Sequence, residues 1–277
     1  MSVLRLAAAG LAVARPAGVE GFRARLERVA GDARAGGADM LLLAEYFSME
    51  AAAGAVPDVR AELARAVGLA DALVAAARAV AIGQRLWLLP GSFAIRGPAG
   101  VVNRAPLIAP DGTTHWTEKH RMTRFEAEEW GIAPGARPAA IPTPWGRVGV
   151  AICYDCEFPP LTRALAVEGA FLILVPACTD AMAGAMRVEI SARAVAIQNQ
   201  CYTAVAPTLG EAPWSAALDR NQGRPAIFGP ADRGFPADGI LAAGGWNTPG
   251  LVFADLDPRR LEAVRQDGAV RNFADWP

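Results

Sequence analysis

The sequence is poor in the residues on which metal and disulfide chemistry depend. It has two histidines and four cysteines, the latter at positions 153, 156, 178 and 201. A zinc site with four protein ligands needs a second ligand pair near Cys153 and Cys156, but Cys178 and Cys201 are too far apart to form an ordinary second pair. We therefore expect neither metal nor cofactor. A chain of 277 residues also needs no disulfide bonds, so reduced thiols in the cytoplasm are the simplest expectation.

Long apolar runs and an excess of one charge are also absent. The longest apolar stretches, such as residues 170–178, are well short of the roughly 20 residues that a membrane-spanning helix needs. The 27 basic and 28 acidic residues nearly cancel. No long-range field therefore favours nucleic acid or an anionic membrane, and a small molecule is the expected partner. Hydrophobic residues make up 53% of the chain, which can supply a sizeable core.

The N-terminal residues allow two interpretations. Arg5 followed by LAAAGLAVA resembles a short signal-peptide core with a small-residue cleavage site. Alternatively, residues 3–13 form a first core strand, followed by an amphipathic helix in which Val19, Phe22 and Leu26 recur at helical spacing. We favour the strand, because its removal would leave that helix without a partner.

Buried strands and helices alternate along the chain. MLLLA is a short buried strand that ends at Glu45, a helical pattern covers residues 58–82, and LWLLPGSF is another strand. Residues 101–117 form two strand-like runs around the turn sequence Pro110-Asp111-Gly112, which predicts a hairpin.

A second round of alternation follows the hairpin. The strand at residues 146–152 stops at Cys153, before a helix that begins near Pro159. FLILVPAC, a helix over residues 186–198 and CYTAVAPT come next, and short strands near residues 226, 240 and 251 complete the chain. No linker divides it, so we expect one domain over residues 1–277, an α/β fold with mixed sheets covered by helices.

Cys153 is the first candidate for chemistry. A sharp turn between a strand and a helix exposes a nucleophile, and the helix end favours the thiolate form of a cysteine. Other interpretations stay open on spacing alone. Cys153 could be a small buried hydrophobe, Cys153 and Cys156 could form a redox pair or half of a zinc site, and Cys153 could pair with His115 or His120 as in cysteine proteases.

The longer string VGVAICYDCEFPP resembles the nucleophile motif of the nitrilase superfamily of carbon–nitrogen hydrolases. The resemblance implies a catalytic glutamate, Glu45 in MLLLAEYF, and a catalytic lysine, Lys119 in TEKHRMTRFEAEEWGIAPG. It further implies a supporting glutamate before Pro134-Gly135, for which Glu128 fits best and Glu126 and Glu129 are rivals. Ala44, where the family often has proline, and Pro160, where an acidic residue is frequent, depart from the pattern without removing a catalytic group.

This resemblance covers nearly the whole chain, and it implies a four-layer α-β-β-α sandwich with two mixed sheets and association into a homodimer or larger assembly. It also implies a mechanism. Cys153 attacks an amide carbonyl as Glu45 takes its proton, Lys119 and the backbone N–H of Tyr154 stabilise the oxyanion, and water releases the acid from a thioester.

We therefore predict a hydrolase of small amides. The alternatives are an N-acyltransferase or nitrile hydrolase that uses the same residues, and a ligand-binding scaffold without turnover. Four residues are predicted to line the substrate pocket: Tyr46, Phe47, Asp180 and Trp214.

Overall fold

The computed structural model describes residues 2–53 and 58–276. Its α-helices are α1 (Gly18–Ala35), α2 (Val59–Gln84), α3 (Pro159–Val167), α4 (Met182–Asn199) and α5 (Pro258–Asp267). Three short helical segments are η1 (Phe47–Ala52), η2 (Phe125–Trp130) and η3 (Cys153–Glu157). The strands are β1 (Leu4–Ala12), β2 (Met40–Leu42), β3 (Trp87–Leu89), β4 (Phe93–Gly97), β5 (Gly100–Ile108), β6 (Thr114–Glu118), β7 (Ile141–Thr143), β8 (Gly146–Val150), β9 (Ala170–Ala177), β10 (Tyr202–Glu211), β11 (Arg220–Asn221), β12 (Ala226–Phe228), β13 (Ile240–Ala243) and β14 (Gly250–Leu256).

The strands form one continuous mixed sheet in the order β4-β5-β3-β2-β1-β10-β9-β8-β7, with the others on its margins. β1 connects the two halves of this sheet. Along its first part it pairs with β2 in parallel and with β14 antiparallel, and at Leu11 and Ala12 it pairs with β10 in parallel. The predicted α/β fold with mixed strand pairing is confirmed. The two predicted sheets are not separate, because the end of β1 continues the hydrogen bonding from one half into the other.

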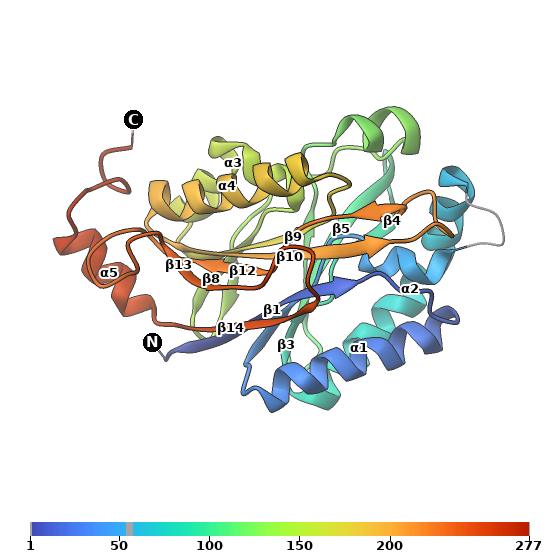
Figure 1. Ribbon diagram of the computed structural model, residues 1–277, viewed down its shortest axis with the longest axis horizontal. Helices are drawn as coiled ribbons and strands as arrows, with labels where there is room; N and C mark the ends of the chain where they lie inside the picture. Colours follow the sequence, from blue (N-terminus) through green and yellow to red (C-terminus); the bar gives the residue numbers. More distant parts are fainter. Residues whose placement is uncertain (1, 54–57, 277) are drawn as a thin grey trace.

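Helices cover the sheet on two sides. In Figure 1, α1 and α2 lie against the half that contains β1 and β3, and α3 and α4 lie against the half that contains β8 to β10. β2 shows how this arrangement divides the side chains. Leu41 packs among the residues of α1 and α2, whereas Met40 and Leu42 point into the larger core shared with β8 and β9. Alternate residues of a strand face opposite sides, so this short strand serves both cores.

The expected elements are present with shifted boundaries. The hairpin of β5 and β6 turns at Pro110-Asp111-Gly112, where the Gly112 N–H donates to the Ala109 carbonyl at 2.8 Å. LWLLPGSF is divided into β3 and β4, since Pro90 lacks an N–H and Gly91 has a φ of +87°. The N-terminal stretch forms β1, as the strand interpretation predicted.

One helix among the described residues, α2, is long and apolar enough to cross a membrane by length and composition alone. In the fold it packs along α1, and its Leu63, Leu73 and Val80 side chains are buried. The core helix of a folded domain has the same composition, and we interpret α2 in this way.

Candidate active site

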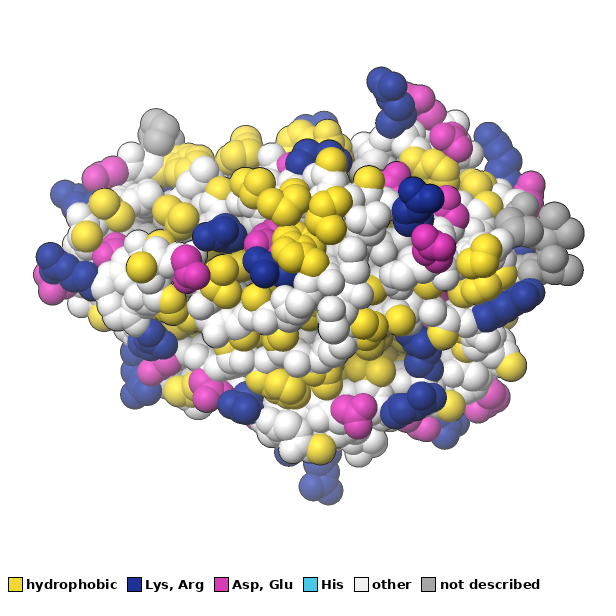
Figure 2. Space-filling view, in the orientation of Figure 1, with side chains coloured by type: hydrophobic (Ala, Val, Ile, Leu, Met, Phe, Trp, Pro, Cys, Tyr) yellow, Lys and Arg dark blue, Asp and Glu magenta, His cyan; other side chains and the backbone are white. Residues whose placement is uncertain are grey.

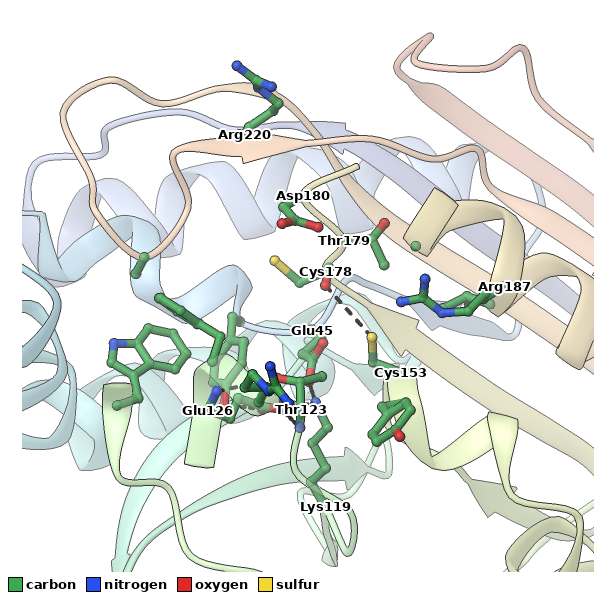
Figure 3. A pocket seen from close by; sticks show the side chains of 18 of the residues that line it. Glu45, Lys119, Thr123, Glu126, Cys153, Cys178, Thr179, Asp180, Arg187 and Arg220 are labelled. Carbon is green, nitrogen blue, oxygen red and sulfur yellow. Dashed lines mark hydrogen bonds and ion pairs between the residues drawn. The ribbon is translucent and has the colours of Figure 1, made fainter. Parts of the chain in front are cut away.

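Three strand ends deliver Glu45, Lys119 and Cys153 to one cavity of about 400 Å³. Glu45 follows β2, Lys119 follows β6 and Cys153 follows β8. Figure 3 shows the carboxylate, the ammonium group and the sulfur atom of these residues facing the same space. Side chains that are up to 108 positions apart in the sequence therefore meet, as the resemblance implied.

Lys119 is held by two carboxylates. Its Nζ lies 2.8 Å from Glu45 Oε1 and 2.6 Å from Glu126 Oε2, and all three side chains are almost wholly buried. A buried ammonium group is stable only when it is paired and hydrogen-bonded, and here both conditions are met.

The supporting-glutamate candidate that contacts Lys119 is Glu126, which was a rival on sequence alone, whereas the favoured Glu128 lies outside the site. Glu128 is 65% exposed and pairs with Arg124 at 3.3 Å on the surface. Both residues lie on η2, a π-helical turn that directs Glu126 and Trp130 inward and Glu128 and its neighbour Glu129 outward. Spacing from Pro134-Gly135 could not reveal this, because the direction of each side chain depends on the unusual turn.

Glu126 is fixed by further donors. Its Oε1 accepts the Tyr46 hydroxyl at 2.7 Å, and its Oε2 accepts both the N–H and the hydroxyl of Thr123 at 3.0 Å. Burial would raise the pKa of Glu126, but the charge of Lys119 and these hydrogen bonds outweigh it and lower the pKa. Glu126 is thus a permanent counter-ion that holds Lys119 in place.

For the pKa of Glu45, in contrast to that of Glu126, burial outweighs the neighbouring positive charge. Burial raises the pKa of Glu45 to about 7, and the positive charge of Lys119 offsets burial only in part. The carboxyl group can therefore both accept and return a proton near neutral pH. For Lys119, burial alone would lower the pKa, but the carboxylates of Glu126 and Glu45 outweigh it and raise the pKa well above its usual value.

Burial disfavours the thiolate form of Cys153. Burial, followed by the negative charge of Glu45, raises the pKa of Cys153 well above its usual value, against the opposing charge of Lys119. Any preference of the helix end for the thiolate is outweighed by burial and by the charge of Glu45. Glu45 lies within hydrogen-bond reach of this thiol and can accept its proton.

The Cys153 turn is strained and clamped. Cys153 has a φ of +49°, a left-handed conformation that is rare for a residue with a Cβ, and its Sγ lies 3.7 Å from the Cys178 carbonyl oxygen. Two residues further on, the Asp155 carboxylate accepts the N–H groups of His120 and Arg121 at 3.0 and 2.8 Å. The turn that carries the nucleophile is thereby tied to the loop that carries Lys119.

Sequence reasoning did not assign Asp155 or Asn103. Asp155 is the third residue of the CYD string, so the motif itself could have identified it. Asn103 of β5 is fully buried, and its Nδ2 donates to Glu45 Oε1 at 2.9 Å and lies 3.4 Å from Glu126 Oε1. Only the tertiary structure identifies it, because an asparagine within a strand carries no recognisable pattern.

The predicted pocket residues divide into two groups. Tyr46 and Asp180 line the cavity, whereas Phe47 and Trp214 are not among its lining residues; Tyr154, predicted as an oxyanion donor, also lines it. Phe47 is fully buried, with its ring centroid 5.2 Å from that of Phe22 on α1, because η1 turns it away from its neighbour Tyr46. Trp214 packs partly buried against the apolar cluster beside the site.

Three further side chains take up the wall of the cavity. Trp130 contacts Tyr46 edge to face at 4.8 Å between ring centroids, Cys178 lies beside Cys153, and Arg187 of α4 points inward from the rim (Figure 3).

The described part of the chain does not support the two alternatives of a zinc site and of a catalytic pair of Cys153 with a histidine. Within residues 2–53 and 58–276, no group of three His, Cys, Asp or Glu side chains could hold a metal ion. His115 stacks on Trp87, and the His120 ring is hydrogen-bonded to the Gly135 carbonyl at 3.0 Å. All four cysteines are free, and the Cys156 thiol is buried with its Sγ 3.9 Å from the Val188 carbonyl oxygen.

Comparison with known proteins agrees with this geometry. The sequence profile of the carbon-nitrogen hydrolase family matches residues 5–266. A probable hydrolase of Bacillus subtilis, YhcX, is 34% identical over 196 residues, which are 71% of this chain and 38% of that longer protein. A deaminated glutathione amidase of Synechocystis is 28% identical over 244 residues, 83% of this chain and 84% of that protein.

Among solved structures, an amidase from Nesterenkonia sp. is similar with a TM-score of 0.76 and 26% identity, over 96% of this chain and 95% of that one. Other structures of that amidase hold acrylamide or butyramide, or carry an acetamide moiety added covalently at the active-site cysteine. The resemblance to the nitrilase superfamily is confirmed, and so is the enzyme class, hydrolysis of carbon–nitrogen bonds other than peptide bonds. The chain belongs to the carbon-nitrogen hydrolase family.

Proposed function

We propose that the protein hydrolyses small aliphatic amides to the acid and ammonia through a thioester at Cys153. One observation carries this proposal: a thiol, a carboxyl group with a pKa of about 7 and a doubly paired ammonium group share one cavity. A nucleophile, a proton shuttle and an oxyanion donor are the three groups that amide hydrolysis requires.

In the first half of the reaction, the Cys153 sulfur attacks the carbonyl carbon and its proton passes to Glu45. The carbonyl oxygen becomes negative and is stabilised by Lys119 and the backbone N–H of Tyr154, where a single donor contributes about 3 kcal/mol. Glu45 then gives the proton to the leaving nitrogen, ammonia departs, and the acyl group stays on sulfur.

In the second half, a water molecule replaces ammonia. Glu45 takes a proton from the water and hydroxide adds to the thioester carbon. The carbon–sulfur bond then breaks to release the acid, and Glu45 returns its proton to the sulfur, which restores the thiol. Glu126 does not exchange protons in this scheme. Its lowered pKa keeps it charged, and it holds Lys119 in the orientation that both halves need.

Three expectations accompany this proposal. We propose that the two halves of the curled sheet stack as a four-layer α-β-β-α sandwich, that copies of the chain associate, and that the enzyme works in the cytoplasm. Association is supported by exposed apolar side chains on the outer face of α4, among them Met186, Ile190 and Ile197. Figure 2 shows hydrophobic side chains over the part of the surface where α3 and α4 lie.

The decisive experiment is intact-mass analysis after exposure to a panel of amides that includes acetamide, acrylamide and butyramide. We expect release of ammonia and an adduct whose added mass equals the acyl group. The Cys153→Ala variant should form no adduct, whereas Cys201→Ala, which removes a buried thiol remote from the cavity, should form it normally. Normal ammonia release by Cys153→Ala would overturn the proposal, and transfer of the acyl group to an added amine would instead identify an acyltransferase.

A further inference from the structure

The loop between β10 and β11, residues 212–219, forms one side of the cavity, although the reaction scheme does not use it. Ala216, Ala217 and Asp219 of this loop line the cavity. Ala217 packs against an apolar cluster that also contains Tyr46 and Trp130, which line the cavity too. The rings of Tyr46 and Trp130 and the methyl group of Ala217 therefore supply apolar surface to the cavity.

A buried carboxylate from a remote helix holds this loop. Glu62 lies near the start of α2 and is fully buried. Its Oε2 accepts the Ser215 hydroxyl at 2.6 Å and the Ala217 N–H at 3.3 Å, and its Oε1 accepts the Ala216 N–H at 2.9 Å and the Asp58 N–H at 3.3 Å. All four donors are neutral. A carboxyl group that is buried in this way needs such hydrogen bonds to compensate for its lost hydration.

The end of the loop that leads into β11 is anchored beside Cys153. Asn221 is buried, and its Nδ2 donates to the Leu218 carbonyl at 2.6 Å. Its Oδ1 accepts from the Cys178 thiol at 3.2 Å, and the carbonyl oxygen of Cys178 is the atom 3.7 Å from the Cys153 sulfur. The loop is therefore held at its middle by Glu62, and near its end it is connected through Asn221 and Cys178 to the surroundings of the Cys153 sulfur.

We infer that residues 212–219 are the wall that selects the size of the acyl group, and that Glu62 is the positioning residue that holds this wall. The inference rests on the proposed function, since it assigns the acyl end of the same site. Ala216 and Ala217 present only methyl groups to the cavity that Tyr46 and Trp130 also line. A larger side chain at either position would take up part of the space that is open to a short aliphatic chain.

The size selection by this loop is tested with the variants Ala217→Leu and Ala216→Leu and a series of unbranched amides from acetamide to hexanamide. We expect kcat/KM for butyramide and hexanamide to fall by at least about tenfold in one or both variants, with that for acetamide changed by less than about threefold. The control is Ala64→Leu, an exposed position on α2, which should leave the whole series unchanged. Equal changes for every amide, or no change, would overturn the size-selecting role.

The role of Glu62 is tested with Glu62→Ala and Glu62→Gln. Loss of the carboxylate should raise KM for butyramide and reduce the preference between butyramide and acetamide, while the pH dependence of kcat keeps its midpoint. The glutamine, which retains one acceptor oxygen, should show a smaller effect. Glu50→Gln removes another buried carboxylate, one that binds the Ala14 N–H at 3.0 Å and makes no contact with the loop, and should keep the preference.

Hydrogen exchange supplies a readout that does not depend on activity. In the wild-type protein the N–H groups of Ala216 and Ala217 should exchange slowly, and Glu62→Ala, or Ser215→Ala if that variant does not fold, should speed their exchange. Fast exchange in the wild type would refute the anchoring of the loop. A wild-type protein that hydrolyses no amide yet protects these two groups would refute the proposed function and the size selection, but not the anchoring.

Discussion

Lys119 is the only lysine in the sequence, and every other basic residue is an arginine. Its surroundings explain why an arginine would not serve here. An ammonium group is a compact charge with three donors, and Lys119 directs it to two carboxylates at 2.6 and 2.8 Å inside a closed site. The planar guanidinium group is larger and binds carboxylates in a fork, so it would displace Glu45 or Glu126.

Glu126 and Glu128 form a matched pair for mutagenesis. Glu126→Gln leaves the shape of the site but weakens a charged, buried hydrogen bond to Lys119, a loss of about 1.5 to 3 kcal/mol. We expect kcat/KM for an amide to fall roughly ten- to hundredfold. Glu128→Gln should change it by less than about twofold, since its surface ion pair contributes little. Steady-state kinetics of both variants decide the matter, and equal activities would contradict the role given to Glu126.

The pH dependence of the reaction reports on Glu45. Because this carboxyl group has a pKa of about 7 and must be ionised to accept the thiol proton, the protonated, inactive fraction grows as the pH falls. We expect kcat/KM to decrease about tenfold for each pH unit below 7. Initial rates between pH 5 and 9, with circular dichroism as a check on folding, measure it. A rate that stays constant down to pH 5 would show that Glu45 is not the base.

At the scale of the elements, the ends of strands position the candidate catalytic side chains. Glu45 stands where β2 has ended, and the next residue, Tyr46, has a φ of +57°. The Tyr46 N–H donates to the Ser92 hydroxyl at 3.0 Å, and the Ser48 hydroxyl donates to the Ser92 carbonyl at 2.8 Å. The segment after β3 therefore shapes the backbone that presents Glu45.

Gly91 is the glycine on which this contact depends. It has a φ of +87°, and a Cβ there would collide with the Ala44 carbonyl oxygen. Gly91→Ala should destabilise the fold by more than about 1 kcal/mol and lower activity, because the backbone beside Glu45 must shift. Chemical denaturation and amide hydrolysis measure the two effects.

Gly68 supplies the control for that substitution. It lies exposed within α2, and a methyl group added there would meet no atom of the described residues within 4 Å beyond the backbone of its own helix. Gly68→Ala should stabilise the protein by about 0.5 to 1 kcal/mol through helix propensity and leave catalysis unchanged. A Gly91→Ala protein as stable and active as the Gly68→Ala protein would disprove the proposed contact.

At the scale of the whole molecule, β1 unites the two halves. It lies between β2 and β14 and reaches β10 with its last residues, so residues near the N-terminus share a sheet with residues near position 208. The cavity lies where the two halves meet, with Glu45 and Lys119 from one and Cys153 from the other. The reacting groups can be aligned only when both halves are folded together.

Association of copies through α4 can be tested on the exposed apolar side chains. Ile190 is 57% exposed on α4, and Ile82 is 45% exposed on α2, on the opposite side of the molecule. If copies associate through α4, Ile190→Glu should lower the molar mass measured by light scattering during gel filtration, since a charge cannot be buried there unpaired. Ile82→Glu should leave the mass unchanged, and a monomeric wild-type protein would exclude the assembly altogether.

The sequence by itself determined the alternation of strands and helices, the hairpin before Lys119 and the turn that carries Cys153. These features depend on local signals: apolar runs, turn residues and the CYD string. Glu45 and Lys119 were predicted through the resemblance of their segments to the nitrilase superfamily, and not from these local signals alone.

Only the tertiary structure showed that Glu126, and not Glu128, contacts Lys119. It also showed that Phe47 lies in the core and that Asn103 and Glu62 lie beside the site. Each of these outcomes depends on which way a side chain points and on what a distant segment places against it. The directions in which the pKa values of Glu45 and Cys153 shift likewise depend on the tertiary structure, because burial and neighbouring charges cause these shifts.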